Sequence, residues 1–409
     1  MTSRKTSELK PNRRAEAILP SATLAVSARA GELRAAGKSV LNFSAGEPDF
    51  KPPAPVAAAV RELVDGSPIH YAPVAGLPEL RDAAAAELAQ YHGHAFTRAH
   101  VMVSCGAKHS LANLFLVTLE PGDEVVILAP YWVSYPEMVR LGGGTPRIVD
   151  ATLDDGWRVR PEALAEALGP KTRYVVINSP SNPTGAGYSA ADLQALYDVI
   201  EAEAPQAWLL CDDIYRKLAY GDYSHASAFR ALAGRTEQII VVDGVSKSHA
   251  MTGYRIGFLA APPAIIAAAS RIQGQMTSGA ATPSQRAAIA ALCDPACEVE
   301  VAAMRDAFAR RRDLILEGLA TIPGVRVHPP EGAFYVFADF GRFIGEGRAH
   351  ADDVALATWL LETALVATVP GSAFGAPGHL RISYATSDEA LEDGVSRIRA
   401  ALAGLESAS

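Results

Sequence analysis

Six short apolar runs rich in β-branched residues recur through the middle of the chain, and they constrain its fold more than any other feature. They are residues 101–103, 125–128, 174–177, 208–211, 239–242 and 256–259. Most of the gaps between them hold long connections or helical patterns, such as residues 190–202, where apolar side chains recur at helical spacing. Apolar strands separated by helices are typical of a parallel sheet that is buried on both faces. The sequence therefore predicts an α/β domain over about residues 60–300.

The pattern changes after this domain. Residues 299–319 predict a long charged helix, residues 332–337 and 380–384 predict short strands, and residues 388–402 predict a closing helix. We interpret residues 301–409 as a smaller α+β domain. Residues 1–59 form an N-terminal arm with a loop at residues 44–50, and we expect this arm to pack on the smaller domain.

Composition excludes several classes of protein. The 409 residues are 49% hydrophobic and 20% charged, which is typical of a globular protein, and the net charge of −8 argues against a nucleic-acid surface. No apolar stretch reaches the roughly 18 residues of a membrane span, and residues 1–14 carry basic side chains without an apolar segment. These features predict a cytoplasmic protein. The cysteines, which we expect to be free thiols, are Cys105, Cys211, Cys293 and Cys297.

Two short motifs resemble known ligand sites, and we assign neither to a ligand. Residues 31–39 end in Gly37-Lys38-Ser39 like a phosphate loop, but a helical pattern leads into them, so Gly37 is interpreted as a helix C-cap. His92-Gly93-His94 lacks a third metal ligand and is interpreted as a solvated loop. We therefore expect no metal site.

Strand ends are more informative, because ligands of open α/β sheets bind outside the carboxyl ends of the strands. The first apolar run leads into Gly106 and Ala107 and then into a helix over residues 108–119, so the exposed amides of the two residues are a candidate anion site. Asp212 ends the run 208–211, and a buried carboxylate there needs a cationic partner, either an arginine or a protonated heterocycle.

A lysine and an arginine follow the later strands. Lys247 lies among small residues after the run 239–242. Desolvation at such a strand end lowers the pKa of an amine and allows it to attack a carbonyl, although a solvated lysine is the alternative. Arg255, eight residues further, precedes the last apolar run and could hold an anion.

Four ordered segments carry a resemblance to a known family: residues 178–185 (Asn-Ser-Pro-Ser-Asn-Pro-Thr-Gly), 212–215 (Asp-Asp-Ile-Tyr), 246–257 and 381–385 (Arg-Ile-Ser-Tyr-Ala). Together they resemble the class I pyridoxal-phosphate aminotransferases. Residues 45–50, 71–81 and 130–138 narrow the resemblance to the bacterial aspartate aminotransferase branch called 1-beta. The resemblance covers about residues 15–402 and implies fold type I, in which a large cofactor domain with a mostly parallel seven-stranded sheet is joined to a smaller α+β domain.

The resemblance implies a role for each matching residue toward pyridoxal 5′-phosphate. Lys247 would hold the cofactor covalently and move the substrate proton. Asp212 would pair with the pyridinium nitrogen, and Asn182 and Tyr215 would hydrogen-bond the phenolic oxygen. In the same way, the resemblance implies that Trp132 stacks on the ring. The phosphate would be bound by Gly106, Ala107 and Arg255 of the same subunit and by Tyr71 of a neighbouring subunit. This sharing of sites implies a homodimer.

Substrate contacts follow from the same resemblance. Arg381 would clamp the α-carboxylate with help from the Gly46 amide, and Trp132 and Asn182 would line the same pocket. Lys108 and Thr23 match residues that contact the distal carboxylate in relatives that use dicarboxylates. Two departures limit the match: Leu19 stands where close relatives often carry Lys, and Gly244 stands where many relatives carry a hydroxyl residue.

The resemblance therefore implies an aminotransferase that moves the amino group of aspartate, or of a related amino acid, to 2-oxoglutarate by a ping-pong route. The nearest alternative is an aminotransferase specific for aromatic amino acids or prephenate, because it would use the same cofactor residues with a different pocket. More remote alternatives are a pyridoxal-phosphate lyase and an aminotransferase-like transcription regulator, which needs a DNA-binding segment that the acidic composition does not favour.

Overall fold

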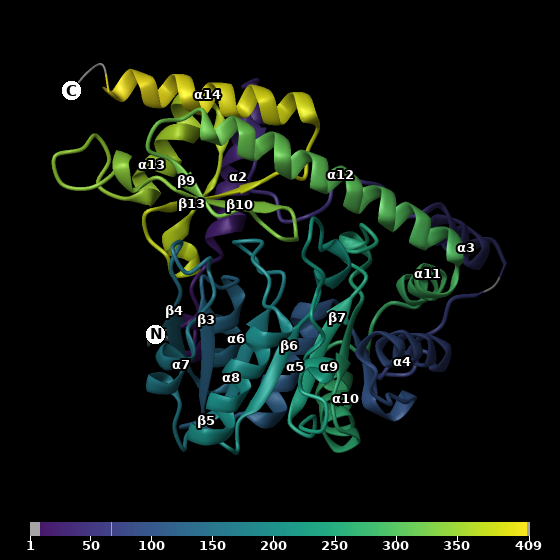
Figure 1. The fold of residues 1–409 in the computed structure, drawn as a ribbon. Coiled ribbons are helices and arrows are strands. Elements are labelled where there is room, and N and C mark those ends of the chain that lie inside the picture. Colours follow the sequence, from purple (N-terminus) through teal and green to yellow (C-terminus); the bar gives the residue numbers. More distant parts are fainter. Residues whose placement is uncertain (1–8, 67, 407–409) are drawn as a thin grey trace, which may run out of the picture.

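A computed structural model describes residues 9–66 and 68–406 (Figure 1). Residues 1–8, Ser67 and residues 407–409 lie outside the described residues. Residues 1–8 are part of the segment in which we predict no secretory signal. Ser67 lies in the predicted large domain, and residues 407–409 end the predicted smaller domain. Among the helices that the structure describes, none is long and apolar enough to cross a membrane.

The central element is a seven-stranded sheet in the order β2-β8-β7-β6-β5-β3-β4. All neighbours are parallel except β8, which runs antiparallel to both β2 and β7. The predicted mostly parallel, seven-stranded sheet is therefore confirmed. The strands are β2 (Val101–Ser104), β3 (Glu124–Ala129), β4 (Thr145–Asp150), β5 (Thr172–Asn178), β6 (Trp208–Asp212), β7 (Ile239–Gly244) and β8 (Gly257–Ala260).

Six of these strands coincide with the six apolar runs, and β4 is the strand that the sequence pattern does not reveal. It lies at the edge of the sheet and pairs with β3 alone. Only Val149 of its six residues is buried, and Pro146 interrupts its apolar character. The other edge strand, β2, is fully buried and does form an apolar run, so it is the exposure of β4 that leaves no apolar run in the sequence.

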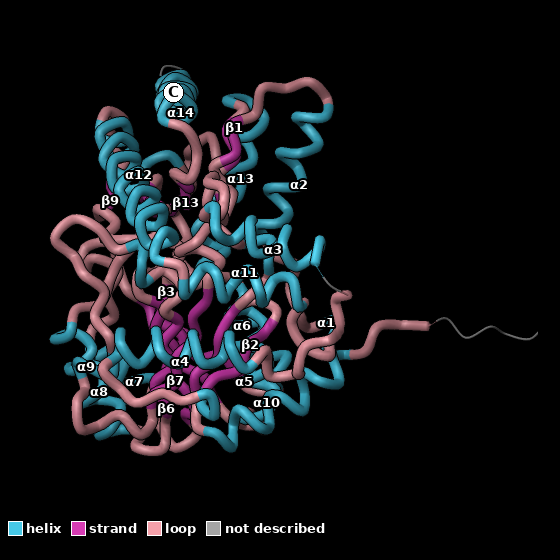
Figure 2. The backbone as a smooth tube through the Cα atoms, turned by 90° about the vertical axis from the view of Figure 1, so that its right-hand side faces the viewer, coloured by secondary structure: helices cyan, strands magenta, loops and turns pink. Residues whose placement is uncertain are grey.

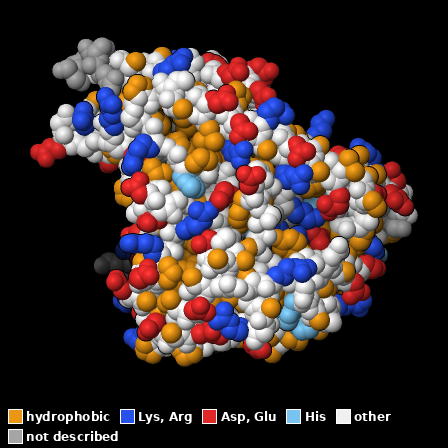
Figure 3. Space-filling model, viewed as in Figure 1, with side chains coloured by type: hydrophobic (Ala, Val, Ile, Leu, Met, Phe, Trp, Pro, Cys, Tyr) orange, Lys and Arg blue, Asp and Glu red, His pale blue; other side chains and the backbone are white. Residues whose placement is uncertain are grey.

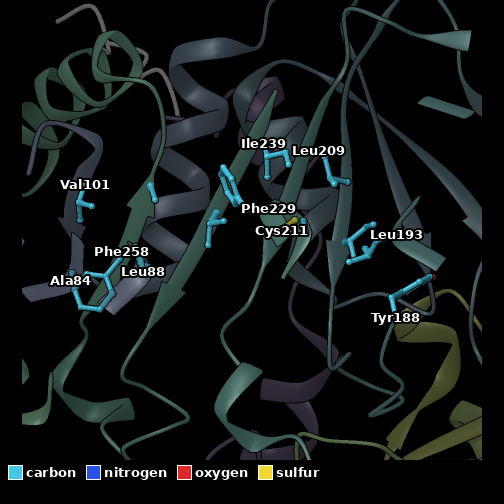
Figure 4. Packing of buried hydrophobic residues seen from close by; sticks show 14 of the residues in the cluster. Ala84, Leu88, Val101, Tyr188, Leu193, Leu209, Cys211, Phe229, Ile239 and Phe258 are labelled. Carbon is cyan, nitrogen blue, oxygen red and sulfur yellow. The ribbon is translucent and has the colours of Figure 1, made fainter. Parts of the chain in front are cut away.

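Helices cover both faces of this sheet, and alternate strand residues point to opposite faces. One face packs on α3 (Ala54–Gly66), α4 (Pro78–His92), α7 (Pro161–Ala167), α8 (Ala190–Glu203), α9 (Ala228–Ala231) and α11 (Thr282–Cys293). In that core Leu193 of α8 lies with Leu209 of β6 and Ile239 of β7 (Figure 4). The other face packs on α5 (Ala107–Thr118), α6 (Ser134–Gly142) and α10 (Pro263–Met276).

The carboxyl-terminal part forms a second sheet in the order β12-β13-β10-β9, whose strands are antiparallel. They are β9 (Arg326–Val327), β10 (Tyr335–Asp339), β12 (Val369–Pro370) and β13 (His379–Ser383). The helices α12 (Pro295–Ala320) and α14 (Asp388–Glu406) lie side by side over this sheet, and α13 (Asp353–Trp359) flanks it (Figure 1). The element order agrees with the α+β pattern expected after residue 298.

The N-terminal arm contacts both parts of the molecule. After the short α1 (Arg13–Glu16), helix α2 (Ala22–Ala35) packs near β12. Strand β1 (Leu41–Asn42) pairs in parallel with β11 (Val366–Ala367). Figure 2 shows β1 beside α2 and α13. By contrast, α3 packs on α11 of the large sheet. The division at residues 1–59, 60–300 and 301–409 stays a prediction.

The interpretation of residues 92–94 as a solvated loop is wrong. His92 is the buried last residue of α4, and its Nδ1 lies 2.9 Å from the Ser227 hydroxyl oxygen. Leu80, Ala84 and Leu88 precede it at intervals of four, so His92 continues the inward stripe of the helix. Among the described side chains, no group of three or more His, Cys, Asp or Glu is arranged to hold a metal.

Other local interpretations agree with the structure. Gly37 lies just past the end of α2 with a φ of +82°, where the amides of Gly37 and Lys38 bond back to carbonyls of the last turn. All four cysteines are free. Acidic and basic side chains are interspersed on the face drawn in Figure 3.

Candidate active site

A cavity of about 220 Å³ lies at the carboxyl ends of the large-sheet strands, between that sheet, the N-terminal arm and the smaller sheet. The structure brings most of the predicted site residues together in its wall. Those that line it are Thr23, Gly46, Ala107, Lys108, Trp132, Asn182, Asp212, Tyr215, Lys247, Arg255 and Arg381.

Lys247 provides a nucleophilic amine in this cavity. It follows β7, and burial, partly opposed by the charge of Glu47, lowers the pKa of its ammonium group to about 8. Its Nζ donates a 2.5 Å hydrogen bond to the carbonyl oxygen of Gly46 in the N-terminal arm. A substantial fraction of Lys247 is therefore neutral near pH 8 and able to attack a carbonyl.

Asp212 provides a carboxylate that lacks a positive partner. It ends β6 and is buried, and its Oδ2 accepts a 2.6 Å hydrogen bond from the Tyr135 hydroxyl. Burial raises the pKa of Asp212 to about 7. Among the described residues it forms no ion pair, so a ligand with a cationic group on this side of the cavity would restore its ionised form.

The neighbouring Asp213 faces the other way. Its Oδ1 lies 3.3 Å from His225 Nε2, and its Oδ2 lies 3.9 Å from His92 Nε2. Burial acts to raise the pKa of Asp213, but the two histidines and Arg216 hold it below the usual value. Because burial lowers the pKa of His92 to about 4, the His92 contact joins a neutral ring to a carboxylate. Only Asp212 of the two lines the cavity.

An anion site lies where α5 begins. Gly106 precedes Ala107 with a φ of +89°, and a Cβ there would lie 2.5 Å from Arg255 Nη2. A Cβ on Gly257 would lie 2.1 Å from the Ala107 nitrogen. These glycines let the guanidinium approach the amide of Ala107, the first of α5, whereas the Gly106 amide donates to the Ser104 carbonyl at 2.7 Å. The Ala107 amide and the guanidinium together attract an anion such as a phosphate.

The absent hydroxyl at Gly244 has a structural reason. Gly244 ends β7 opposite Gly257 of β8, and a Cβ there would lie 2.9 Å from the Ile256 carbonyl oxygen. A larger residue would have to displace the neighbouring strand. Ser246, which sequence reasoning did not select, lines the cavity and places a hydroxyl group two residues further along.

A second anion site lies at the small-domain end. Arg381 is buried on β13, where Nη1 donates to Asn182 Oδ1 at 3.0 Å and Nη2 donates to the Ser44 carbonyl at 2.7 Å. Its Nε is buried without a hydrogen-bond partner. The guanidinium carries five N–H groups, of which two are used here, so a buried Arg381 with no neighbouring carboxylate keeps donors for a carboxylate ligand.

Two further predicted residues, Lys108 and Thr23, line the cavity. The Lys108 ammonium lies 4.9 Å from the centre of the Trp132 ring, and burial together with the charge of Arg255 lowers its pKa. The Thr23 hydroxyl is buried without a hydrogen-bond partner. Tyr71, in contrast, is 94% exposed and does not line the cavity of its own chain.

Sequence reasoning missed two tyrosines. Tyr135 donates to Asp212, and Tyr335 of β10 lines the cavity beneath Arg381. Tyr135 lies three residues after Trp132, one helical turn along a segment that already carries the family resemblance, so its spacing was available as a signal. Tyr335 lies in an apolar strand, and its sequence context predicts a residue of the hydrophobic core.

Comparison with known proteins adds the following findings. The family model "Aminotransferase class I and II" matches residues 38–398. An aspartate/prephenate aminotransferase of Cereibacter sphaeroides is 44% identical over 95% of this chain and 97% of its own, and an aspartate aminotransferase of Geobacillus stearothermophilus is 43% identical over 95% and 98%. The solved structure of Thermus thermophilus aspartate aminotransferase with maleate superposes with a TM-score of 0.89 at 41% identity, covering 96% of this chain and all of that one.

Proposed function

The chain belongs to the class I and II aminotransferases, and from that premise we propose that it transfers the amino group of aspartate to 2-oxoglutarate with pyridoxal phosphate as cofactor. The observation that carries the proposal is that Lys247, Asp212 and Arg381 line one cavity. The Lys247 amine has a lowered pKa, the Asp212 carboxylate has no ion-pair partner among the described residues, and the Arg381 Nε has no hydrogen-bond partner. When bound, pyridoxal phosphate supplies an electron-withdrawing ring that stabilises negative charge at the substrate α-carbon.

The cavity fits this cofactor at each of its functional groups. Asp212 needs a cation, which a protonated ring nitrogen provides. The Ala107 amide at the start of α5 and the guanidinium of Arg255 suit the phosphate, and the amine of Lys247 suits the aldehyde. Trp132, on the same wall, is placed to cover a ring face.

The chain's own groups would then perform the remaining work. Lys247 accepts and returns a proton at its Nζ, which its lowered pKa allows near neutral pH. Asn182 and Tyr215 line the cavity and would offer an amide and a phenol to the cofactor's phenolic oxygen.

We propose a dicarboxylate substrate because the cavity holds cations toward both of its ends. Arg381 would bind the α-carboxylate through two parallel hydrogen bonds, assisted by the Gly46 amide. Lys108 and the free hydroxyl of Thr23 would meet the distal carboxylate. Aspartate and 2-oxoglutarate both carry these two groups.

The first test measures half-reactions. Lys108→Ala should lower the specificity for aspartate and 2-oxoglutarate by roughly 10- to 150-fold, because it removes a charge-assisted hydrogen bond worth about 1.5–3 kcal/mol. Spectra of the bound cofactor are followed after addition of aspartate, glutamate, alanine or phenylalanine. Alanine and phenylalanine are the controls, since they lack a distal carboxylate and should react equally with both proteins.

Two results would contradict the proposal at different points. A wild-type protein whose cofactor spectrum changes with none of these amino acids is not an aminotransferase of this class. An equal loss for all four donors in Lys108→Ala, with weaker cofactor retention, would assign Lys108 to the phosphate instead of the substrate. Thr23 would then be the remaining distal contact.

One alternative specificity has support of its own. Several relatives, including the Cereibacter sphaeroides protein, are named aspartate/prephenate aminotransferases. Leu24 lines the cavity and is 69% exposed, and Leu19 on the same segment is 67% exposed, so the mouth offers apolar surface for a ring. Prephenate is therefore included as an amino acceptor in the same assay. We do not propose a pyridoxal-phosphate lyase or an aminotransferase-like regulator for this chain. A cytoplasmic location stays a prediction.

We also propose a homodimer in which each subunit completes the other's phosphate site. Tyr71 lies on an exposed loop held by its own chain: Thr282 Oγ1 donates to the His70 carbonyl, and the buried Gln273 Nε2 donates to the Val74 carbonyl. A loop fixed at its base with a bare tyrosine at its tip is suited to reach a second copy of the chain.

Subunit mixing tests this sharing. Tyr71→Phe and Lys247→Ala subunits mixed after dissociation should regain about a quarter of the wild-type activity per site, because half of the dimers are mixed and each has one site with both residues intact. The unmixed variants, treated in the same way, are the controls. A mixture no more active than the sum of its parts would place Tyr71 outside the partner's site.

A further inference from the structure

Tyr335 lies directly beneath the guanidinium of Arg381. The two residues belong to neighbouring antiparallel strands, β10 and β13, in which Tyr335 pairs with Ser383 and Phe337 pairs with Arg381. Diagonal neighbours of this kind share one face of a sheet. Both side chains are fully buried, and the Arg381 Cζ lies 4.5 Å from the centre of the Tyr335 ring. The ring therefore supports the arginine and receives its positive field.

The hydroxyl of Tyr335 meets the hydroxyl of Tyr215 at an oxygen–oxygen distance of 3.1 Å. Tyr215 comes from the loop after β6 of the large sheet, three residues beyond Asp212, so this contact joins the two sheets across the cavity. Both phenols line the cavity and are buried. One of the two must donate its hydrogen to the other.

The surrounding charges decide which phenol donates. Burial raises the pKa of Tyr335, but the positive charge of Arg381 and the bond to Tyr215 act in the opposite direction. Burial raises the pKa of Tyr215 well above its usual value, and Tyr335 and the nearby carboxylate of Asp212 raise it further, whereas the charge of Arg381 opposes them. The guanidinium lies over the Tyr335 ring and therefore acts more directly on Tyr335. Tyr335 is thus the more acidic phenol, and in a hydrogen-bonded pair the more acidic hydroxyl is the better donor.

We propose that Tyr335 is a positioning residue whose hydroxyl donates to the Tyr215 oxygen, so that the Tyr215 hydrogen points into the cavity toward the phenolic oxygen of the bound cofactor. The chain Arg381–Tyr335–Tyr215 then connects the carboxylate clamp to the phenol that tunes the cofactor. This inference rests on the proposed function, because it assigns the phenolic oxygen of pyridoxal phosphate to that side of the cavity.

The arrangement has a spectroscopic consequence. A Tyr215 hydrogen directed at the phenolic oxygen favours the anionic form of that oxygen and lowers the pH at which the cofactor band changes. Without the Tyr335 hydroxyl, Tyr215 loses the bond that orients it and strengthens its donation. Tyr335→Phe should raise the midpoint of the cofactor absorbance by about 0.4 to 1 pH unit, which corresponds to one hydrogen bond between neutral groups.

The experiment titrates the absorbance of the holoenzyme with pH and compares Tyr335→Phe with a matched variant, Tyr220→Phe. Tyr220 and Tyr384 form another buried pair of hydroxyls in the same core, outside the cavity, and Tyr220 also donates to the Ala333 carbonyl. Tyr220→Phe therefore reports the effect of losing buried tyrosine hydrogen bonds in this core. Its midpoint should stay at the wild-type value. Affinity for maleate, a dicarboxylate without an amino group, should change less than about twofold in Tyr335→Phe because the ring stays under Arg381.

A double variant shows whether Tyr335 acts through Tyr215. In a Tyr215→Phe background, Tyr335→Phe should add no further shift. If Tyr335→Phe fails to fold, Tyr335→Met replaces it, because methionine is a flexible apolar side chain without a hydroxyl and should produce the same upward shift. The maleate comparison is made only with Tyr335→Phe, since methionine removes the ring beneath Arg381.

The outcomes are distinct. An unchanged or lower midpoint in Tyr335→Phe, an equal shift in Tyr220→Phe, or a further shift in the double variant would each overturn the inference while leaving the proposed function intact. A wild-type protein with no cofactor band would overturn the proposed function, and the role of Tyr335 would fall with it.

Discussion

Lys247→Ala is expected to abolish covalent attachment of pyridoxal phosphate and to lower turnover by about 10⁴-fold or more, because the same amine both binds the cofactor and moves the substrate proton. Burial lowers the pKa of Lys247 to about 8, so the neutral amine becomes the main form above that pH. The rate of attachment to the cofactor-free wild type should therefore rise as the pH passes through about 8 and then level off.

Borohydride reduction followed by peptide mapping identifies the attached residue. Lys108→Ala is the matched control, since Lys108 is another lysine of the same cavity and its removal should leave the label in place. A reduced label on Lys108, or one that persists in Lys247→Ala, would contradict the assignment. Thermal unfolding of both variants establishes that the comparison is made between folded proteins.

Asp212→Asn should keep the fold and bind the cofactor, yet lower turnover by about 10²–10³-fold or more, because a neutral amide cannot hold the ring nitrogen protonated where negative charge develops. The measurement is single-turnover kinetics with aspartate on the reconstituted variant. The Tyr135 hydroxyl can still donate to the amide oxygen at this position, so the local packing is retained.

Asp213→Asn is the matched control for this prediction. The Asp213 carboxylate faces His225 and His92, so the substitution should cost about 1–3 kcal/mol of stability by weakening its contact with His225 but leave the chemical step nearly unchanged. Should Asp213→Asn be the slow variant and Asp212→Asn the nearly normal one, the ring nitrogen would have to meet Asp213 instead.

Stability without cofactor offers a separate check on Asp212. Its folded-state pKa of about 7 lies above the usual value, so the folded state holds the proton more tightly than the unfolded state does. The contribution to stability is complete below about pH 4 and is lost as the pH rises to about 7. Cofactor-free Asp212→Asn should therefore gain stability relative to the wild type between these pH values, and chemical denaturation at both ends measures the difference.

The sequence alone predicted the large sheet because buried strands need continuous apolar runs, which are a local property of the chain. It also predicted which residues follow those strands, and hence that Asp212, Lys247 and the Gly106–Ala107 turn would meet at one edge. The roles assigned to individual residues came from the ordered motifs and remain proposals. The sequence pattern did not predict strand β4, because this strand buries one side chain only.

The tertiary structure decided how side chains of equal type differ in their surroundings. Asp212 and Asp213 are the same residue on successive positions, and only the packing of His92 and His225 around Asp213 shows that one carboxylate faces a cavity and the other faces two histidines. The pairing of Tyr335 with Tyr215 joins residues 120 positions apart, so no local pattern contains it. Burial, free donors and the direction of a carboxylate depend on groups that the fold brings from distant parts of the chain, whereas apolar periodicity depends on neighbours along it.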